Sequence, residues 1–174
     1  AVVVGHQADL VRQAIVLATS GKSDGSPVAI VEQQEQLGTG HAVLQSRPVF
    51  AVGKRGAPSR YLILNGDTPL LQEKTVRELL RVHEVERATV TILTAMLEDA
   101  SGYGRVVRAH SVERGVSRIV EDRDANAEER AIHEINVGTY VVDGEFLFNA
   151  LEKLDPSNAQ GEYYLTEIVH LAAE

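Results

Sequence analysis

The feature that most constrains the fold of this chain is the alternation of short apolar runs with amphipathic helical segments in its first half. Strands are predicted at residues 2–4, 28–31 and 61–64, with helices at 8–18 and 73–85. Such alternation is typical of parallel strands joined by right-handed helical crossovers. We therefore predict an α/β fold with a mixed, mainly parallel sheet flanked by helices.

The second half of the chain departs from this rhythm. A long β-rich run at 88–97 is followed by shorter predicted strands near 104–107 and 116–120, and the charged stretch 121–130 is predicted to be exposed. A strand at 135–142 follows, with helices at 145–154 and 163–173. Antiparallel additions to a parallel core are common, so these segments fit one mixed sheet in a single domain over residues 1–174.

Individual segments carry further expectations. A loop is predicted at 21–27, a helix beginning at 42–44, and burial of Leu10, Ile15 and Leu17 on the first helix. On the helix at 73–85, the apolar spacing turns Val76, Leu79, Leu80 and Val82 inward.

Composition excludes several functional classes. Seventeen basic against 25 acidic residues give a formal charge of −8, which argues against a partner such as nucleic acid or an anionic membrane but not against a small phosphorylated molecule. The absence of cysteine excludes disulfides, a thiolate nucleophile and cysteine-ligated metal centres. Without a long apolar run or a signal-peptide pattern, a cytoplasmic location is expected.

The run at 61–64 ends in Asn65, Gly66 and Asp67, and it is predicted to be buried on both faces. Ligands of α/β sheets bind outside the carboxyl ends of strands, so Asp67 is well placed to hold a metal ion. The alternative is that Thr68 and Pro69 begin a helix, whose amino end Asp67 favours electrostatically. This segment alone leaves both interpretations open.

Two further regions could bind a ligand. Residues 33–41 place Gln33, Gly38 and Thr39 between a strand and a helix, and a glutamine amide suits the edge of a nucleobase, although an exposed turn explains the same pattern. Gly104 could allow close approach of a ligand or simply form a turn. Glu121 and Asn136, attached to apolar strands, could bind sugar hydroxyls or lie on the surface.

Other site types are not indicated. The six histidines lack the spacing of metal ligands, and neither a Walker-type phosphate loop nor a dinucleotide-binding glycine triplet is found.

Taken together in order, segments 33–42, 64–71, 102–105, 119–125, 134–138 and 158–167 resemble one family. It is the bacterial bifunctional N-acetylglucosamine-1-phosphate uridyltransferase and glucosamine-1-phosphate acetyltransferase. The resemblance is to its amino-terminal uridyltransferase domain and covers essentially the whole chain. Segments 35–42 and 158–166 are the most specific matches.

The resemblance implies a Rossmann-like nucleotide-diphospho-sugar transferase fold and a role for each candidate residue. Asp67 would be a catalytic residue that ligates Mg²⁺, and Asn65 would stand where the family often has tyrosine. The implied substrate contacts are Gln33, Gly38 and Thr39 to uridine, Gly104, Glu121 and Asn136 to the amino sugar, and Asn65 and Gly66 in the crevice between the two substrates.

The implied reaction makes UDP-N-acetylglucosamine and pyrophosphate from UTP and N-acetylglucosamine-1-phosphate, a precursor step for peptidoglycan and lipopolysaccharide. The family's nucleotide loop would precede Ala1, and a second Mg²⁺ ligand would follow Glu174, so the domain is expected to be incomplete at both ends. The acetyltransferase β-helix domain, which makes the family trimeric, also lies outside the chain. A nucleotidyltransferase for another sugar phosphate or base, and a non-catalytic nucleotide-sugar-binding module, remain alternatives.

Overall fold

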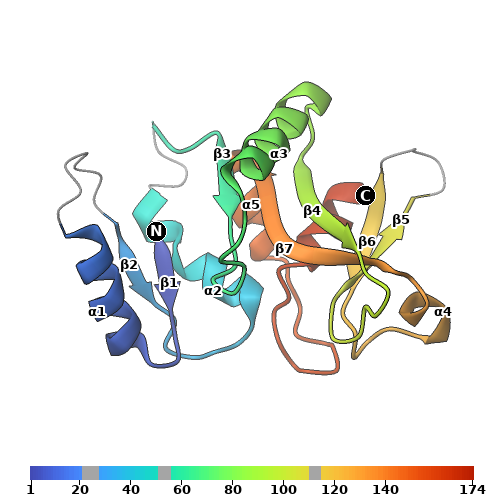
Figure 1. Cartoon of the computed structure of the whole chain (residues 1–174), viewed down its shortest axis with the longest axis horizontal. Helices are drawn as coiled ribbons and strands as arrows, with labels where there is room; N and C mark the ends of the chain where they lie inside the picture. Colours follow the sequence, from blue (N-terminus) through green and yellow to red (C-terminus); the bar gives the residue numbers. More distant parts are fainter. Residues whose placement is uncertain (21–27, 51–55, 110–114) are drawn as a thin grey trace.

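The computed structural model describes residues 1–20, 28–50, 56–109 and 115–174 (Figure 1). The loop predicted at 21–27 lies outside this part of the chain. The elements, in order, are β1 (Val2–Val4), α1 (Ala8–Thr19), β2 (Ile30–Glu32), α2 (Thr39–Gln45), the 3-10 helix η1 (Arg47–Phe50), β3 (Arg60–Ile63), α3 (Glu73–Glu86), β4 (Val90–Met96), β5 (Arg105–Arg108), β6 (Val116–Val120), α4 (Ala127–Arg130), β7 (Glu134–Asp143), α5 (Gly144–Leu151) and α6 (Glu167–Ala173).

These strands form two sheets. Strands β1 and β2 pair in parallel, and the second sheet has the order β3-β7-β5-β6, with β4 paired to β7. β7 is the organising strand, because β3 and β4 each pair with it over residues 140–142. The strands predicted from apolar runs are therefore present, with boundaries that differ by a few residues.

The expectation of a mainly parallel sheet is wrong for the described strands, because only β1 and β2 pair in parallel. Both β3 and β4 are antiparallel to β7 and so run in the same direction, as the crossover through α3 requires. β7 lies between β3 and β4, so each of these two strands pairs antiparallel with β7 and they do not pair in parallel with each other. The α/β class and the mixed sheet flanked by helices are confirmed.

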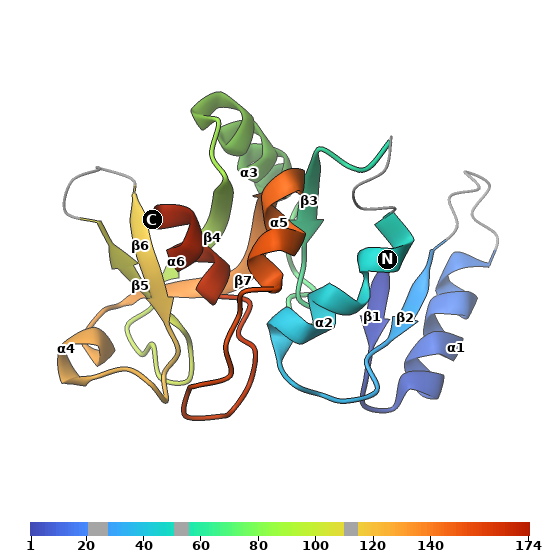
Figure 2. The same ribbon diagram turned by 180° about the vertical axis from the view of Figure 1, so that it is seen from behind.

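The core lies where α5 and α6 cover one face of the second sheet, while α3 covers the opposite face (Figures 1 and 2). Its largest fully buried side chains include Tyr140, Phe148, Leu147 and Ile168. The rings of Tyr61 and Phe148 meet edge to face, with centroids 5.3 Å apart. This packing fixes the carboxyl ends of the strands, from which the loops of the candidate site emerge.

Several burial predictions are wrong. Leu10 and Leu17 are 60% and 76% exposed, because α1 lies at the margin of the molecule beside the small β1–β2 sheet (Figure 1). β3 is not buried on both faces: Tyr61 is 7% exposed, whereas Leu64, just beyond the strand, is 50% exposed. An amphipathic pattern alone does not say how much of the protein covers it.

Helix boundaries also differ from expectation. α2 begins at Thr39, earlier than the predicted start at 42, and α6 begins at Glu167, later than predicted at 163. On α3 Leu79 is buried as expected, and His83, which the apolar pattern does not mark, is buried beside it. Nδ1 of His83 lies 2.9 Å from Oγ1 of Thr91, so a polar pair completes this contact between α3 and β4.

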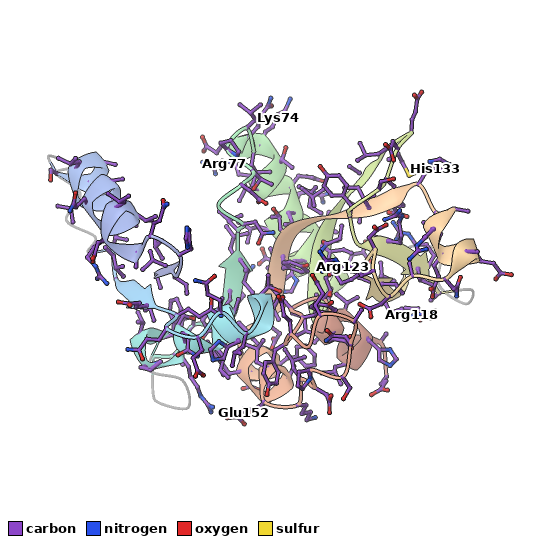
Figure 3. All side chains as sticks on the ribbon, turned by 90° about the horizontal axis from the view of Figure 1, so that it is seen from below. Lys74, Arg77, Arg118, Arg123, His133 and Glu152 are labelled. Atoms are coloured by element: carbon purple, nitrogen blue, oxygen red, sulfur yellow. The ribbon has the colours of Figure 1, made fainter. Side chains whose placement is uncertain are left out.

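Across the described ranges, no helix has both the length and the apolar character that crossing a membrane requires. The basic residues labelled in Figure 3 lie at separate places on the molecule, with Lys74 and Arg77 on α3 far from Arg118 on β6.

Candidate active site

A cleft of about 270 Å³ opens where the loops after β3, β4 and β6 meet the segment that leads into α6. Figure 1 shows the loops after β4 and β6, with the segment that leads into α6, below the second sheet. The cleft is lined by Thr39, Asn65, Asp67, Thr68, Gly102, Tyr103, Gly104, Glu121, Asn136, Val137, Gly138, Tyr140, Leu165 and Thr166. Six of the predicted site residues thus come together: Thr39, Asn65, Asp67, Gly104, Glu121 and Asn136.

The structure tests one of the two interpretations of Asp67, the one that places it beside a helix start. Helix α3 begins only at Glu73, after the N-cap residue Gln72, so Asp67 does not lie at a helix start. Oγ1 of Thr68 instead donates to the Asn65 carbonyl at 3.1 Å. The capping interpretation is therefore wrong, and Asp67 is an exposed carboxylate that lines the cleft.

The donor set around Asp67 fits Mg²⁺ bound together with a substrate. Within the described ranges, no group of three or more His, Cys, Asp or Glu side chains could form a metal cage. Mg²⁺ commonly binds through one or two carboxylates plus substrate phosphates and keeps several waters. A single accessible carboxylate at the cleft matches this mode and does not match a structural metal site.

Gly104, Glu121 and Asn136 meet where β5 pairs with its neighbours β6 and β7. The Asn136 amide donates to the Gly104 carbonyl at 2.8 Å. A Cβ on Gly104 would lie 2.9 Å from Cγ2 of Ile119 and 3.4 Å from Oε2 of Glu121. Glycine is therefore needed at this position for the packing of the cleft wall.

Glu121 is a half-buried acceptor at the cleft. Oγ1 of Thr166 donates to its Oε1 at 2.9 Å. Burial raises the pKa of Glu121 above its ordinary value, the Thr166 hydrogen bond lowers it, and the nearby carboxylates of Asp124, Glu162 and Glu167 raise it further. A ligand that donates hydroxyl or amide protons to this carboxylate would compensate part of the cost of burying its charge.

An irregular stretch of β7 shapes the wall opposite. The pairing of β4 with β7 steps from Ile92–Tyr140 to Thr94–Asn136, so β7 contains extra residues at this point. Within the stretch, Nδ2 of Asn136 donates to the Tyr140 hydroxyl at 2.7 Å, and Oδ1 accepts from the Gly138 amide at 3.1 Å. These two bonds hold the Asn136 carboxamide at the cleft.

Gly138 connects this wall to the loop after β3. Its φ is 82°, and a Cβ would lie 2.1 Å from Nδ2 of Asn65. The absence of a side chain therefore makes room for Asn65, which lines the cleft between Asp67 and Asn136. Gly66, by contrast, does not line the cleft, and a Cβ there would have no described residue within 4 Å.

Residues 33–41, which we call the glycine loop, are anchored beside the cleft. Nε2 of Gln33 donates to the Gly38 carbonyl at 3.1 Å and lies 2.9 Å from Nδ1 of His41. Gly38 has a φ of 106°, and a Cβ would lie 2.7 Å from the Tyr163 carbonyl oxygen. Gln33 and Gly38 do not line the cleft, but they hold the turn that delivers Thr39 to it.

Residues 163–166 join the glycine loop to the side of the cleft that Gly104, Glu121 and Asn136 form. The Leu165 amide donates to Oγ1 of Thr39 at 3.0 Å, and the next residue, Thr166, binds Glu121. Sequence reasoning included this stretch in a family resemblance but assigned no role to Thr166. It also missed Tyr140 and Gly138, because the irregular stretch of β7 that brings them to the cleft has no local sequence signal.

The fold and the cleft define an α/β protein with a polar cleft at the carboxyl ends of strands β3 and β6. The chain belongs to the nucleotidyl transferase family, whose pattern matches residues 6–174. Among curated proteins it is similar to "Bifunctional protein GlmU" of Exiguobacterium sp., with 47% identity over 173 residues, which are 99% of this chain and 35% of that protein. The resemblance inferred from the motifs is thereby confirmed.

A second such relative, from Enterococcus faecalis, is 45% identical over 169 residues, which are 97% of this chain and 34% of that protein. The chain thus spans about a third of the length of these relatives. Among solved structures, UDP-glucose pyrophosphorylase in complex with UDP-glucose matches with a TM-score of 0.64 at 16% identity, over 94% of this chain and 61% of that chain. HddC from Yersinia pseudotuberculosis matches with a TM-score of 0.59 at 19% identity, over 94% of this chain and 60% of that chain. These likenesses confirm the nucleotide-sugar transferase fold.

Proposed function

We propose that this protein transfers a uridylyl group from UTP to N-acetylglucosamine-1-phosphate, releasing pyrophosphate and forming UDP-N-acetylglucosamine. One observation carries the proposal: a single cleft gathers the exposed carboxylate of Asp67 with Gly104, Glu121 and Asn136. The similarity to bifunctional GlmU proteins over nearly the whole chain supports the choice of substrates. The broader assignment, to nucleotide and sugar-phosphate substrates, agrees with the nucleotide-sugar fold.

In this proposal the chain acts mainly by holding two substrates in line. The loop anchored by Gln33 and Gly38 binds the uridine, while Glu121 and Asn136 accept and donate hydrogen bonds to the sugar. The phosphate oxygen of the sugar phosphate then attacks the α-phosphorus of UTP opposite the departing pyrophosphate. Positioning of this kind accelerates phosphoryl and nucleotidyl transfer without a covalent enzyme intermediate.

Asp67 would hold Mg²⁺ at the phosphates, with further ligands from the substrates and water. When bound, the ion neutralises phosphate charge and fixes the geometry of the transferred group. Asp67 would contribute by placing this charge, not by accepting a proton. The trimer implied by the family resemblance and the cytoplasmic location expected from the sequence remain proposals alongside this one.

The proposal is tested first at Asp67. In the protein expressed from its complete reading frame, Asp67→Asn should lower kcat for pyrophosphate release by roughly 100-fold or more at saturating Mg²⁺, because a neutral amide binds the ion weakly. Asp9→Asn, which changes an exposed carboxylate on α1 outside the cleft, is the matched control and should leave kcat unchanged. Near-normal turnover of Asp67→Asn would contradict the assignment.

The two alternatives give different results. A nucleotidyltransferase for another base or sugar would release pyrophosphate from a different triphosphate or sugar phosphate, which a substrate panel identifies. A non-catalytic binding module would bind UDP-N-acetylglucosamine without releasing pyrophosphate from any pair of substrates.

A further inference from the structure

Arg105, the first residue of β5, is a charged residue that the proposed chemistry does not use. Its side chain is only 3% exposed. Nη2 lies 3.0 Å from Oδ1 of Asp122, and Nη1 donates to the carbonyl of Tyr103. Nε has no hydrogen-bond partner in the part of the chain that the structure describes. Burying a guanidinium carries a desolvation cost, which its contacts with Asp122 and the Tyr103 carbonyl offset in part.

Both partners of Arg105 adjoin residues of the cleft. Asp122 directly follows Glu121, which lines the cleft. Tyr103 lies between Gly102 and Gly104, and all three line the cleft. The guanidinium therefore ties the loop after β4 to the end of β6. Pairing within the sheet fixes the chain only from Arg105 onward, opposite Val120 and Ile135. The Tyr103–Gly104 peptide lies just before this pairing.

The contact with Tyr103 sets the direction of a backbone donor. A trans peptide is planar, so the N–H of Gly104 points away from the Tyr103 carbonyl. Since that carbonyl accepts from the buried guanidinium, the Gly104 N–H faces the opposite side. Within the described ranges this N–H donates to no other residue, and Gly104 lines the cleft. The donor is therefore left without a partner among the described residues, at a residue of the cleft wall.

We propose that Arg105 is a positioning residue for the sugar half of the cleft. By binding the Tyr103 carbonyl and Asp122 together, it directs the Gly104 N–H and the Glu121 carboxylate toward one bound sugar. The inference rests on the proposed function, because it takes the ligand of this half to be the sugar phosphate. Arg105 does not line the cleft, and in this proposal it touches no substrate itself.

Arg105→Lys is the test, because a lysine ammonium keeps the charge but is a point donor that cannot reproduce the planar guanidinium's two separate contacts. In steady-state assays of the protein from its complete reading frame, KM for N-acetylglucosamine-1-phosphate should rise roughly tenfold. KM for UTP and kcat should stay within about twofold. Arg108→Lys, on the same strand and paired with Glu134 away from the cleft, is the matched control and should leave both KM values unchanged.

Asp122→Asn provides a second variant if Arg105→Lys does not fold. The Asp122 side chain is 34% exposed, so its replacement is tolerated more easily, and the loss of its charge should raise KM for the sugar phosphate alone by roughly threefold. Equal changes in both KM values, or no change, would overturn the inference. A purely structural role would lower the melting temperature without this selectivity.

Failure of the inference can be separated from failure of the proposed function. Absence of pyrophosphate release by the unmodified protein would reject the function, whereas calorimetry would still test Arg105. Arg105→Lys should then weaken binding of UDP-N-acetylglucosamine roughly tenfold and leave binding of UTP unchanged. Equal weakening of the two ligands, or no binding of UDP-N-acetylglucosamine by the unmodified protein, would overturn the inference.

Discussion

Thr166 and Glu121, 45 residues apart in sequence, are joined by a hydrogen bond of 2.9 Å from the threonine hydroxyl to Oε1 of the carboxylate. The neighbouring amide of Leu165 donates to Oγ1 of Thr39 on the glycine loop. Two adjacent residues before α6 thus hold both the loop proposed to bind uridine and the carboxylate proposed to bind the sugar. The relative placement of the two half-sites depends on this short segment.

Thr166→Val should test this link, because valine keeps the shape of the side chain and removes the donor. The pKa of Glu121 should rise further, since the Thr166 hydrogen bond lowers it. The acidic limb of the pH profile for sugar-phosphate binding should therefore move to higher pH. Stability should fall by about 1 kcal/mol, as measured by urea unfolding. Thr166→Ser keeps the hydroxyl and should behave like the unmodified protein; identical behaviour of the two variants would contradict the link.

Glu121→Gln should make the folded protein more stable and weaken its binding of the sugar phosphate. Burial raises the pKa of Glu121 above its value in the unfolded chain. Between these two pKa values the folded protein binds more protons than the unfolded chain does. The free energy of unfolding therefore falls as pH rises from the lower value to the higher one. Removing the charge should raise the melting temperature at pH 7, by about 2–4 °C for each kcal/mol recovered, and abolish this part of the pH dependence. Binding of the sugar phosphate should weaken.

The matched control for this prediction is Glu98→Gln, which changes an exposed carboxylate outside the cleft. Melting curves of both variants between pH 4 and pH 8 provide the comparison. Equal shifts in the two variants would show that net charge, and not the burial of Glu121, is responsible.

Gly38→Ala should destabilise the glycine loop by more than about 2 kcal/mol, because a left-handed φ and a close contact act together. Gly38 has a φ of 106°, and its Cβ would lie 2.7 Å from a Tyr163 carbonyl that already accepts from the Gly40 amide. Gly66→Ala, where a Cβ would have nothing within 4 Å, should cost far less. Chemical denaturation of both variants checks this difference, and equal losses would refute it.

Asn65 and Gly138 should be energetically coupled, since a Cβ on Gly138 would lie 2.1 Å from Nδ2 of Asn65. Gly138→Ala should be less destabilising in an Asn65→Ala background, although strain from its φ of 82° would remain. A double-mutant cycle should give a coupling of about 0.5–3 kcal/mol. Strict additivity would mean that the Asn65 side chain moves away without cost.

Local pattern predicted much of this fold, because β4, β6 and α3 are marked by β-branched runs and by helical spacing of apolar residues. The insertion of β7 between β3 and β4 was not predictable in this way, since strand order depends on contacts between segments far apart in sequence. The exposure of Leu10 and Leu17 on α1 has the same origin. Periodicity identifies an apolar face but not the layer that covers it.

The candidate site was predictable to a similar extent. Asp67, Glu121 and Asn136 each follow or begin an apolar strand, and the structure brings all three to one cleft. Thr166, Tyr140 and Gly138 were not singled out, because their place at the cleft results from a turn before α6 and an irregular stretch of β7. The metal assignment of Asp67 and the substrate contacts remain predictions.

The most direct test of the account measures pyrophosphate release by the protein from its complete reading frame, supplied with UTP, N-acetylglucosamine-1-phosphate and Mg²⁺, with each component omitted in turn. The account predicts release only when all three are present. Release without the sugar phosphate, or no release from the complete mixture, would contradict it.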